Sequence, residues 1–491
     1  MVLPTGLGKT VVALLVASEV LVRSPGSKVM VLAPTRPLVL QHYKSFKEAV
    51  SLPPGDFAVL TGTVDPGERE VMWLRARAVF ATPQTVYNDV RHGRVSLKDV
   101  GLAVFDEAHR SVKDYTYTKL AQAYRESADH PLILGLTASP GATKEKVNEI
   151  KRNLFIEKVE ARDEESDDVR EYVEKTDVEP VRVQVPEEYY EVRLRLRELY
   201  NEKVEKLRKG GFIRGDRVTK KALLEARMAI TARLKASQAS GGQKGYVYAA
   251  IVSQAQAVTI LHALEVVETQ GAPPLVRYLE KLRGREEVGK SVSALMKDPR
   301  WIAIEQEASK LGSTPHAKVG VVLDVVKGQL SKREDSRVIV FTQYRDTIED
   351  IVEALGRNGV VSRKFVGQSD KNGSKGMDQE SQAKTLEDFT QGEFKVLVSS
   401  SIGEEGLHVP DVDLVIFYEA VPSEIRYIQR RGRTGRTAQG RVVILLAEGT
   451  VDEGYFYTTL AKERRMKALV TSTASKAPRR RGAPTLLDFV D

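Results

Sequence analysis

Two separate parts of this chain alternate short apolar runs with helix-like stretches, and this alternation most constrains the fold. The apolar runs of the first part are residues 28–32, 78–81, 102–105 and 132–136. Those of the second part are residues 337–341, 395–398, 414–417 and 442–446. Near-continuous apolar strands between helices are typical of a parallel sheet covered on both faces. The sequence therefore predicts two α/β domains, each with ligands beyond the carboxyl ends of its strands.

The region between these two parts has a different pattern. Residues 156–185 are acidic and polar, and residues 186–310 form long stretches rich in Leu, Ala, Glu, Lys and Arg with helical periodicity. The last residues, 469–491, are rich in Ser, Thr, Ala, Pro and Arg. We therefore predict an α/β domain at 1–155, an acidic linker, an all-helical insert, a second α/β domain at 311–468 and a flexible tail.

The charge of the chain suits a polyanionic partner. Its 491 residues carry a net charge of +8, and residues 191–250 hold 15 Lys and Arg against 6 Asp and Glu. We expect the basic face of the insert to bind nucleic-acid phosphates, with a solvated helix surface as the alternative. The absence of cysteine excludes disulfides and thiolate metal sites. No apolar run reaches the roughly 18 residues of a membrane span, so we expect a cytoplasmic, nucleoid-associated protein with no membrane partner.

A glycine-rich loop lies at the start of the chain. Gly6, Gly8, Lys9 and Thr10 match most of a phosphate-binding loop, although Leu3 stands where that pattern has its first glycine. Glycines let backbone N–H groups approach phosphates, Lys9 would meet the β- and γ-phosphates, and Thr10 would bind Mg²⁺. A chance match in a helix-capping turn is the alternative. The predicted ATP contacts in this loop are Pro4, Thr5, Gly6, Leu7, Gly8, Lys9 and Thr10.

An acidic pair follows the apolar run at 102–105. Asp106 would hold Mg²⁺ together with Thr10. Glu107 would act as the general base that polarises the attacking water. His109 would link the nucleotide site to the rest of the protein. Acidic residues after a strand are also common helix caps, but the phosphate-loop pattern upstream favours a catalytic role.

A basic segment that contains glycines lies far downstream, at residues 429–436. Gln429 could orient water. Arg433 and Arg436 are three residues apart, so they can share one face of a turn and reach a γ-phosphate held by the other domain. A basic loop that binds nucleic acid is the alternative. The predicted catalytic residues are Lys9, Asp106, Glu107, Gln429, Arg433 and Arg436.

These segments resemble those of superfamily 2 helicases of the DEAH-box type, and more narrowly the helicase half of archaeal Hef and the Fanconi anaemia M-type DNA translocases. The matching segments are residues 3–10, 33–38, 60–62, 81–85, 106–109, 136–141, 340–342, 365–368, 403–407 and 429–436. The resemblance implies two RecA-like parallel-sheet motor domains with a thumb-like helical insert between them, and ATP hydrolysis with Mg²⁺. Innate-immune RNA sensors and Dicer-type modules share this architecture, so the nucleic acid stays open.

The resemblance also implies contacts with the sugar-phosphate backbone of one strand, which position the strand without reading its sequence. On the first domain the implied contacts are Pro34, Thr35, Arg36, Thr82, Pro83 and Gln84. On the second domain they are Thr342, Gly367, Gln368 and Ser400. Thr137 and Ser139 would couple hydrolysis to movement. Gly406 would line the nucleotide site, where His408 replaces the aspartate that binds the ribose in relatives.

Both ends of the chain depart from the resemblance. Relatives have a strand and a glutamine-containing adenine contact before the phosphate loop, whereas only Met1 and Val2 precede Leu3. We expect a misassigned start codon. The tail at 483–490 resembles a sliding-clamp-binding peptide without its leading glutamine, so we expect a clamp as a partner, with a loosely packed tail as the alternative. The Glu-Arg-Lys pattern of the nuclease found in some relatives is absent from the sequence.

The resulting hypothesis is an ATP-dependent DNA helicase or translocase that acts on branched or forked DNA in repair or replication-fork processing. One alternative keeps the enzyme class and changes the substrate to double-stranded RNA. A second alternative is a non-hydrolysing DNA-binding or clamp-associated scaffold. The presence of Glu107, Gln429, Arg433 and Arg436 argues against the scaffold.

Overall fold

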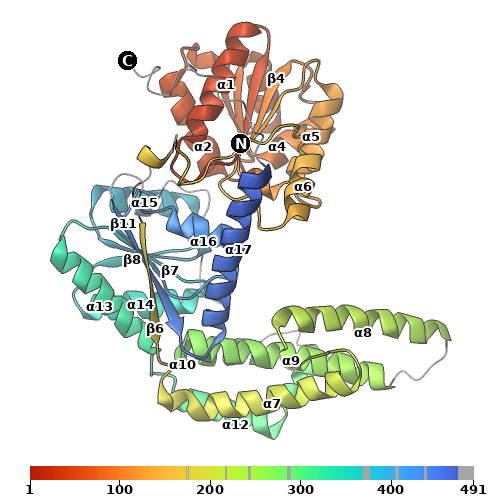
Figure 1. Ribbon diagram of the computed structural model, residues 1–491, viewed down its shortest axis with the longest axis vertical. Helices are drawn as coiled ribbons and strands as arrows, with labels where there is room; N and C mark the ends of the chain where they lie inside the picture. Colours follow the sequence, from red (N-terminus) through yellow and green to blue (C-terminus); the bar gives the residue numbers. More distant parts are fainter. Residues whose placement is uncertain are drawn as a thin grey trace.

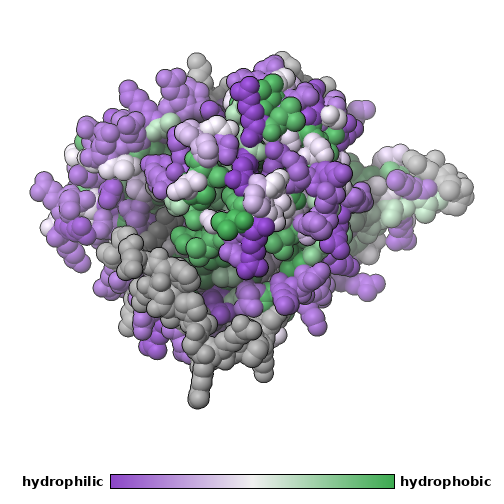
Figure 2. Space-filling model, turned by 90° about the horizontal axis from the view of Figure 1, so that it is seen from above, coloured by the Kyte–Doolittle hydropathy of each residue, from purple (hydrophilic) through white to green (hydrophobic). Residues whose placement is uncertain are grey.

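The computed structural model contains two α/β domains and an elongated helical part (Figure 1). The helical part extends from the second α/β domain, away from the first. Seen from above the first domain, it projects to one side, and hydrophilic side chains dominate the rim of the face in view (Figure 2). The structure describes residues 1–167, 169–172, 174, 176–215, 218–240, 245–284, 289–368, 376–403, 409–435 and 439–473.

The first sheet is parallel, with strand order β2-β3-β1-β4-β5. Its strands are β1 (Lys28–Leu32), β2 (Phe57–Leu60), β3 (Ala78–Ala81), β4 (Val100–Phe105) and β5 (Ile133–Gly135). Its helices are α1 (Lys9–Arg23), α2 (Arg36–Ala49), α3 (Pro66–Arg75), α4 (Pro83–Arg91), α5 (Thr116–Ser127) and α6 (Lys144–Asn153). Alternate residues of β4 pack on α1 and α2 on one face and on α4 to α6 on the other. This double coverage confirms the predicted fold class.

The first residues of the chain continue the hydrogen bonding of this sheet beyond β5. The backbone N–H of Leu3 donates to the carbonyl of Thr137 at 3.1 Å, and Thr137 donates to the carbonyl of Met1 at 3.2 Å. On its other side, Val2 donates to the carbonyl of Glu160 at 2.8 Å. This short pairing fixes where the glycine-rich loop begins, next to the carboxyl end of β5.

The second sheet is also parallel, with strand order β6-β11-β10-β7-β9-β8. Its strands are β6 (Thr176–Val183), β7 (Val338–Phe341), β8 (Ser362–Phe365), β9 (Val396–Ser399), β10 (Leu414–Phe417) and β11 (Gly440–Ala447). Its helices are α13 (Ala317–Lys332), α14 (Arg345–Arg357), α15 (Gln379–Gln391), α16 (Glu424–Arg431) and α17 (Val451–Thr473). The side chains of β7 and β10 pack alternately on α13 and α14 and on α15 to α17.

One strand lies where the sequence predicted only a linker. β6 belongs to the acidic segment 156–185, yet it pairs with β11 at eight consecutive positions and forms an edge of the second sheet. The strand is mostly exposed and contains Pro180. A proline is tolerated on an edge strand because one side of its backbone needs no partner. Charged residues and proline in an edge strand thus concealed it from the pattern of apolar runs.

The helical insert is built around one long apolar helix. Its helices are α7 (Tyr190–Lys209), α8 (Lys220–Ser240), α9 (Gly245–Thr269), α10 (Ala272–Arg283), α11 (Lys290–Met296) and α12 (Pro299–Lys310). α9 packs against α7, α8, α10 and α11. Among the described helices, only α9 has the length and the mean hydropathy, 1.4, of a membrane span, and 61% of that stretch is buried. This burial is that of a core helix, since a helix that is apolar on all sides packs inside a domain.

Candidate ATP site between the two sheet domains

The glycine-rich loop has the backbone that its sequence predicts. Gly6 and Gly8 have φ angles of 87° and 79°, a region that favours glycine. α1 begins immediately afterwards, at Lys9, so the positive end of the helix dipole faces the loop. The Lys9 ammonium donates to the carbonyls of Leu3 at 3.1 Å and Pro4 at 3.2 Å. Lys9 therefore lies over the concave side of the loop, where a phosphate would bind, and Thr10 follows it in the first turn.

Asp106 lies at the end of β4, beside the loop, and is 7% exposed. Its carboxylate is held by the imidazole Nε2 of His42, 2.9 Å from Oδ2, and by the backbone N–H of Glu107, 2.9 Å from Oδ1. Burial alone would raise the pKa of Asp106, but the hydrogen bond from His42 and the positive charges of His42 and Lys9 lower it below its ordinary value. Asp106 is therefore an anion suited to a divalent cation.

Glu107 has a φ angle of 51°, in the left-handed region that few residues other than glycine adopt. Such strain concentrates at functional sites. Its carboxylate lies 3.2 Å from Nδ1 of His109, and the same nitrogen is 3.1 Å from the hydroxyl of Thr137. The Thr137 hydroxyl also accepts from the backbone N–H of Ser139. His109 thus joins the acidic pair to the segment expected to couple hydrolysis to movement.

The basic segment of the second domain reaches the glycine-rich loop of the first. A Cβ added to Gly432 would lie only 2.8 Å from Cβ of Thr5, so the Thr5 side chain packs against the Gly432 backbone in a space that only a glycine leaves open. Gln429 and Arg433 are 6% and 9% exposed. Both polar atoms of the Gln429 amide are buried without a hydrogen-bond partner among the described residues. A buried, unsatisfied amide suits a group that binds water or phosphate. Arg436 lies outside the described residues.

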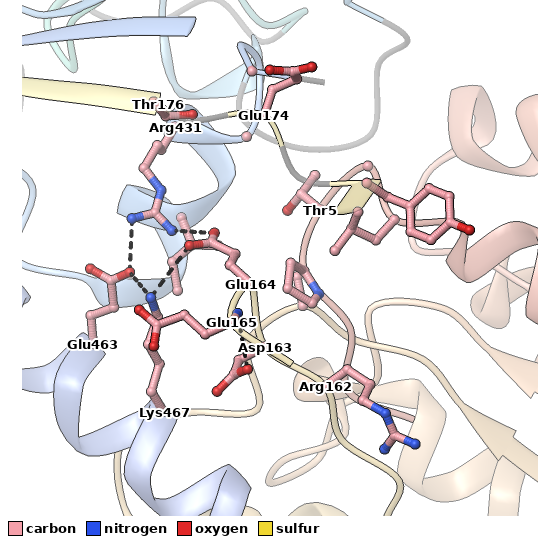
Figure 3. Close-up of a pocket in the computed structure, with 18 of the residues that line it drawn as sticks. Thr5, Arg162, Asp163, Glu164, Glu165, Glu174, Thr176, Arg431, Glu463 and Lys467 are labelled. Carbon is pink, nitrogen blue, oxygen red and sulfur yellow. Dashed lines mark hydrogen bonds and ion pairs between the residues drawn. The ribbon is translucent and has the colours of Figure 1, made fainter. Parts of the chain in front are cut away.

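A cavity of about 890 Å³ lies between the two domains at this contact. Figure 3 shows Thr5 of the first domain on one side of it and Arg431 of the second domain on the other, with the Arg431 guanidinium turned towards Glu164 and Glu463. The loop contributes Pro4, Thr5, Gly6 and Leu7 to its wall, and the basic segment contributes Arg431, Gly432, Thr434 and Gly435. The cavity therefore has walls from both domains. Its described lining residues do not include the predicted catalytic residues Lys9, Asp106, Glu107, Gln429 and Arg433, so their joint contact with a triphosphate stays a prediction.

The acidic linker crosses one side of the cavity. Arg431 pairs with Glu164 of the linker at 2.9 Å and with Glu463 of α17 at 3.0 Å (Figure 3). Lys467 of α17 lies 3.6 Å from Glu164 and 3.7 Å from Glu463. These four residues form a cluster of alternating charges. It ties the linker to the second domain and supplies part of the cavity wall.

The residues implied for strand binding on the first domain gather at the carboxyl edge of its sheet. Thr35 and Thr82 immediately precede α2 and α4, so two helix N-termini point to the same edge. Helix N-termini bind phosphate readily. Arg36 donates to the side chain of Gln379 in the second domain at 2.8 Å. Gln84 is exposed, while Pro34 is partly exposed and Pro83 is buried, so Pro83 offers little surface to a strand.

On the second domain, the residues implied to contact the strand differ in how exposed their side chains are. Gln368 is exposed and Gly367 is partly exposed, whereas Ser400 is only 9% exposed. Thr342 is fully buried, and its hydroxyl donates to Glu419 at 2.8 Å. A direct bond from the Thr342 hydroxyl to a strand is therefore disfavoured. Gly406 and His408 lie outside the described residues, so their nucleotide contacts stay predictions.

Two residues of this region were missed by the sequence reasoning. His42 holds Asp106, but a single histidine within a helix gives no signal of its partner. Glu419 holds Thr342 and faces Arg430. Glu419 follows β10 almost directly, as Asp106 follows β4. An acidic residue after an apolar run was therefore a signal that could have found it.

Three family models cover most of the chain. They are DEAD/DEAH box helicase over residues 1–147, the helical bundle of a putative ATP-dependent RNA helicase over residues 188–308, and helicase conserved C-terminal domain over residues 317–438. Among solved structures, the crystal structure of the Pyrococcus furiosus Hef helicase domain is 43% identical, covers 93% of this chain and 94% of that one, and has a TM-score of 0.67. The chain belongs to the Hef-type superfamily 2 helicases. The helical insert of this family accounts for the region between the two sheets.

Longer curated proteins are also similar to this Hef-type chain. The putative ATP-dependent RNA helicase MJ1505 of Methanocaldococcus jannaschii is 39% identical over 96% of this chain and 58% of its own length. The ATP-dependent DNA helicase mph1 of Sclerotinia sclerotiorum is 34% identical over 92% of this chain and 38% of its own length. The chain thus spans roughly half or less of these relatives.

Proposed function

We propose that this Hef-type helicase is an ATP-dependent DNA translocase that acts on branched or forked DNA. The observation that carries the proposal is the contact of Gly432 with the loop at Thr5, because it brings the basic segment of one domain against the phosphate loop of the other. A cleft with groups from two domains can couple nucleotide hydrolysis to domain closure. Repeated closure and opening would move the two domains along one strand.

The chain's own residues fit ATP and Mg²⁺. Lys9 would bind the β- and γ-phosphates, and Thr10 and Asp106 would hold Mg²⁺, which the lowered pKa of Asp106 favours. Glu107 would accept the proton of the attacking water. Bound ATP would supply the γ-phosphoryl group that is transferred to that water, with ADP as the leaving group, and Mg²⁺ would neutralise the charge of the phosphates. Gln429, Arg433 and Arg436 would orient the water and stabilise the developing charge, as predicted from the sequence.

The proposed substrate follows from the charge of the insert and from the relatives. The relatives named mph1 carry a DNA helicase name, and the basic helical insert projects from the second domain where it could clamp a duplex (Figure 1). The sliding clamp stays a proposed partner of the tail, and residues 483–490 lie outside the described residues. A cytoplasmic, nucleoid-associated location, with no membrane partner, is part of the same proposal.

Double-stranded RNA is the second candidate substrate. The family model of the insert and the relative MJ1505 both carry RNA helicase names. ATP turnover should be measured with forked DNA, linear duplex DNA and duplex RNA at several salt concentrations. We expect forked DNA to stimulate turnover most, and the affinity to fall steeply with salt because phosphate contacts dominate it. Stronger stimulation by duplex RNA would replace the DNA proposal.

A variant of the phosphate loop tests the enzymatic assignment. We expect Lys9→Ala to lower ATP turnover by at least about 100-fold, while salt-sensitive DNA binding stays within twofold or so. Lys44→Ala is the matched control, because Lys44 is exposed on α2. Full turnover in Lys9→Ala would contradict the assignment. Absence of turnover in the unmodified protein with every nucleic acid would favour the scaffold.

A further inference from the structure

The end of the central insert helix is bonded directly to the second sheet domain. Gln270, the residue after α9, is 2% exposed. Its amide nitrogen donates to Oε2 of Glu419 at 3.4 Å, and its amide oxygen accepts from the hydroxyl of Thr347 at 2.8 Å. The amide nitrogen also donates to the hydroxyl of Thr269, within the insert, at 3.1 Å. Both polar atoms of one buried side chain thus bond to the second domain, and the insert cannot rotate there without breaking these bonds.

Glu419 connects this contact to two segments that the helicase needs. Its carboxylate also accepts from the hydroxyl of Thr342 at 2.8 Å and from the backbone N–H of Gln343 at 2.9 Å. On its other side it lies 3.7 Å from the guanidinium of Arg430, which is fully buried. Arg430 belongs to the basic segment that touches the phosphate loop. Glu419 therefore lies between the insert, the segment at 342–343 and Arg430 of the basic segment.

The surroundings of Glu419 make this arrangement sensitive to the loss of any member. Arg430 lies over the rings of Phe341 and Phe417, with 5.2 and 5.4 Å to their centroids. Burial raises the pKa of Glu419 above its ordinary value, although the charge of Arg430 and the hydrogen bond from Thr342 partly oppose this rise. In so apolar a site, a lost hydrogen bond is not replaced by water, so neighbouring groups must move to compensate.

A second set of contacts holds the same end of α9. The ammonium of Lys318 donates to the carbonyl of Thr269 at 3.3 Å and pairs with the buried carboxylate of Asp452. The Nε2 of His316 lies 3.0 Å from the carbonyl of Glu268. These bonds anchor the backbone of the two residues before Gln270, so the insert can tilt slightly about this attachment without detaching. The side chain of Gln270 would then transmit the tilt to the second domain.

We propose that Glu419 is a positioning residue that couples the insert to the arginine-rich segment, with Gln270 as its contact on the insert. A strand or duplex held by the insert shifts the end of α9. The shift passes from Gln270 to Glu419 and then to Arg430, three residues before Arg433. The inference rests on the proposed function, because it needs a nucleic acid that raises ATP turnover.

The test compares two glutamines of comparable burial at α9. Gln270→Leu removes the contact with Glu419, whereas Gln254→Leu removes a bond to the carbonyl of Leu223, which lies within the insert. We expect Gln270→Leu to lower the DNA-stimulated kcat about 5- to 20-fold. Basal turnover, the KM for ATP and the DNA concentration for half-stimulation should stay within about twofold of the unmodified protein. The Gln254→Leu control should leave all four quantities unchanged.

Each outcome decides a different question. Unchanged stimulation in Gln270→Leu would overturn the inference alone. An equal loss in Gln254→Leu would also overturn it, because the effect would then be a general loosening of the insert. An unmodified protein whose turnover no nucleic acid raises would overturn the proposed function and, with it, the inference.

Two further variants keep the test valid if Gln270→Leu does not fold. Thr347→Val keeps the shape of the side chain and removes its bond to Gln270, so a smaller loss of stimulated kcat is expected. Glu419→Gln should lower stimulated turnover more strongly. Combining it with Thr347→Val should add little further loss, because both act through one set of contacts. Strict additivity of the two losses would contradict the proposed coupling.

Discussion

The two sheet domains use polar residues in opposite ways. In the first domain, the groups of the candidate ATP site come mainly from two short continuous segments, 3–10 and 106–109, at one edge of the sheet. Where the second domain joins the insert, buried polar groups far apart in the sequence meet. Examples are Glu419 with Gln270 of the insert, and Lys318 with the carbonyl of Thr269. The comparison teaches that local segments supply the chemistry, while long-range contacts hold the second domain and the insert in a fixed orientation.

The same contrast appears in the carboxylates. Burial would raise the pKa of Asp106, but the hydrogen bond from His42 and the nearby positive charges lower it. At Asp452, by contrast, burial outweighs the pairing with Lys318 and raises the pKa. Asp106 is therefore held ready as an anion for a cation that joins it, whereas Asp452 already has its permanent partner.

The largest effect on activity is expected from removing the predicted general base of the first domain. We expect Glu107→Gln to lower the ATP turnover number by about 10²- to 10⁴-fold, because general base catalysis contributes that much. ATP binding and the unfolding midpoint should hardly change, since the substitution keeps the shape. Glu126→Gln, at an exposed position of α5, is the control. A twofold effect on turnover would show that Glu107 is not the base.

In the second domain, the corresponding loss should appear in stability. Lys318→Met leaves the buried carboxylate of Asp452 without its partner, and breaking such a pair costs about 3–5 kcal/mol. The change should be visible in the free energy of unfolding from urea titrations. Lys327→Met is a matched control on the same helix, because Lys327 is exposed and its bond to Asn358 is exposed too. Equal free energies of unfolding for the two variants would show that the buried pair of Lys318 and Asp452 does not stabilise the second domain.

Most of the fold could be predicted because its signal is local. The buried strands are short apolar runs, and each predicted run coincides with a strand to within one or two residues. β2, β6 and β8, which all form edges of the two sheets, were missed. β6 carried no apolar signal because an edge strand buries little and tolerates charges and Pro180. The division into two parallel-sheet domains with a helical insert followed from the change in periodicity between the segments.

The site could be predicted only in part, for a related reason. Gly6, Lys9 and Asp106 lie in segments whose order and spacing indicate phosphate binding. His42 could not be found, because its partner lies 64 positions away and nothing near it in the sequence indicates a contact. The hydroxyl of Thr342 was expected to face a strand but is buried against Glu419. Contacts between distant buried groups depend on packing, which one sequence does not reveal.

A smaller effect, on the Mg²⁺ requirement, is expected from replacing His42. His42→Ala removes the hydrogen bond that orients the Asp106 carboxylate. Loss of such a partner of a metal ligand commonly weakens metal binding by about 10- to 100-fold. We therefore expect a corresponding rise in the Mg²⁺ concentration for half-maximal turnover, with a nearly unchanged kcat at saturating Mg²⁺. The exposed His92→Ala is the control. An unchanged Mg²⁺ requirement would reduce His42 to a packing residue.

The two regions should also differ in how their contribution to stability depends on pH. His316 is 1% exposed, and its two ring nitrogens lie 3.1 Å from the backbone N–H of Lys318 and 3.0 Å from the carbonyl of Glu268. The first contact needs an acceptor and the second a donor, so the ring must be neutral. Burial, with the charge of Lys318, lowers its pKa to about 3. The neutral ring stabilises the folded state fully above about pH 6.5, the ordinary histidine pKa.

That stabilisation is lost as the pH falls from 6.5 towards 3, because the unfolded chain then binds a proton that the folded one does not. The expected slope is about 1.4 kcal/mol per pH unit. His316→Asn keeps an acceptor and a donor without titrating, so its unfolding free energy should fall less between pH 6 and pH 4. Urea titrations at pH 7, 6, 5 and 4 measure the difference, with the exposed His130→Asn as control.

Because Asp106 has a lowered pKa, its own contribution to stability is lost only below about pH 4. As the pH falls, the contact of His316 between the insert and the second domain should therefore lose its stabilising effect at a higher pH than Asp106 does. The same dependence of the unfolding free energy on pH in the unmodified protein and in His316→Asn would contradict this prediction.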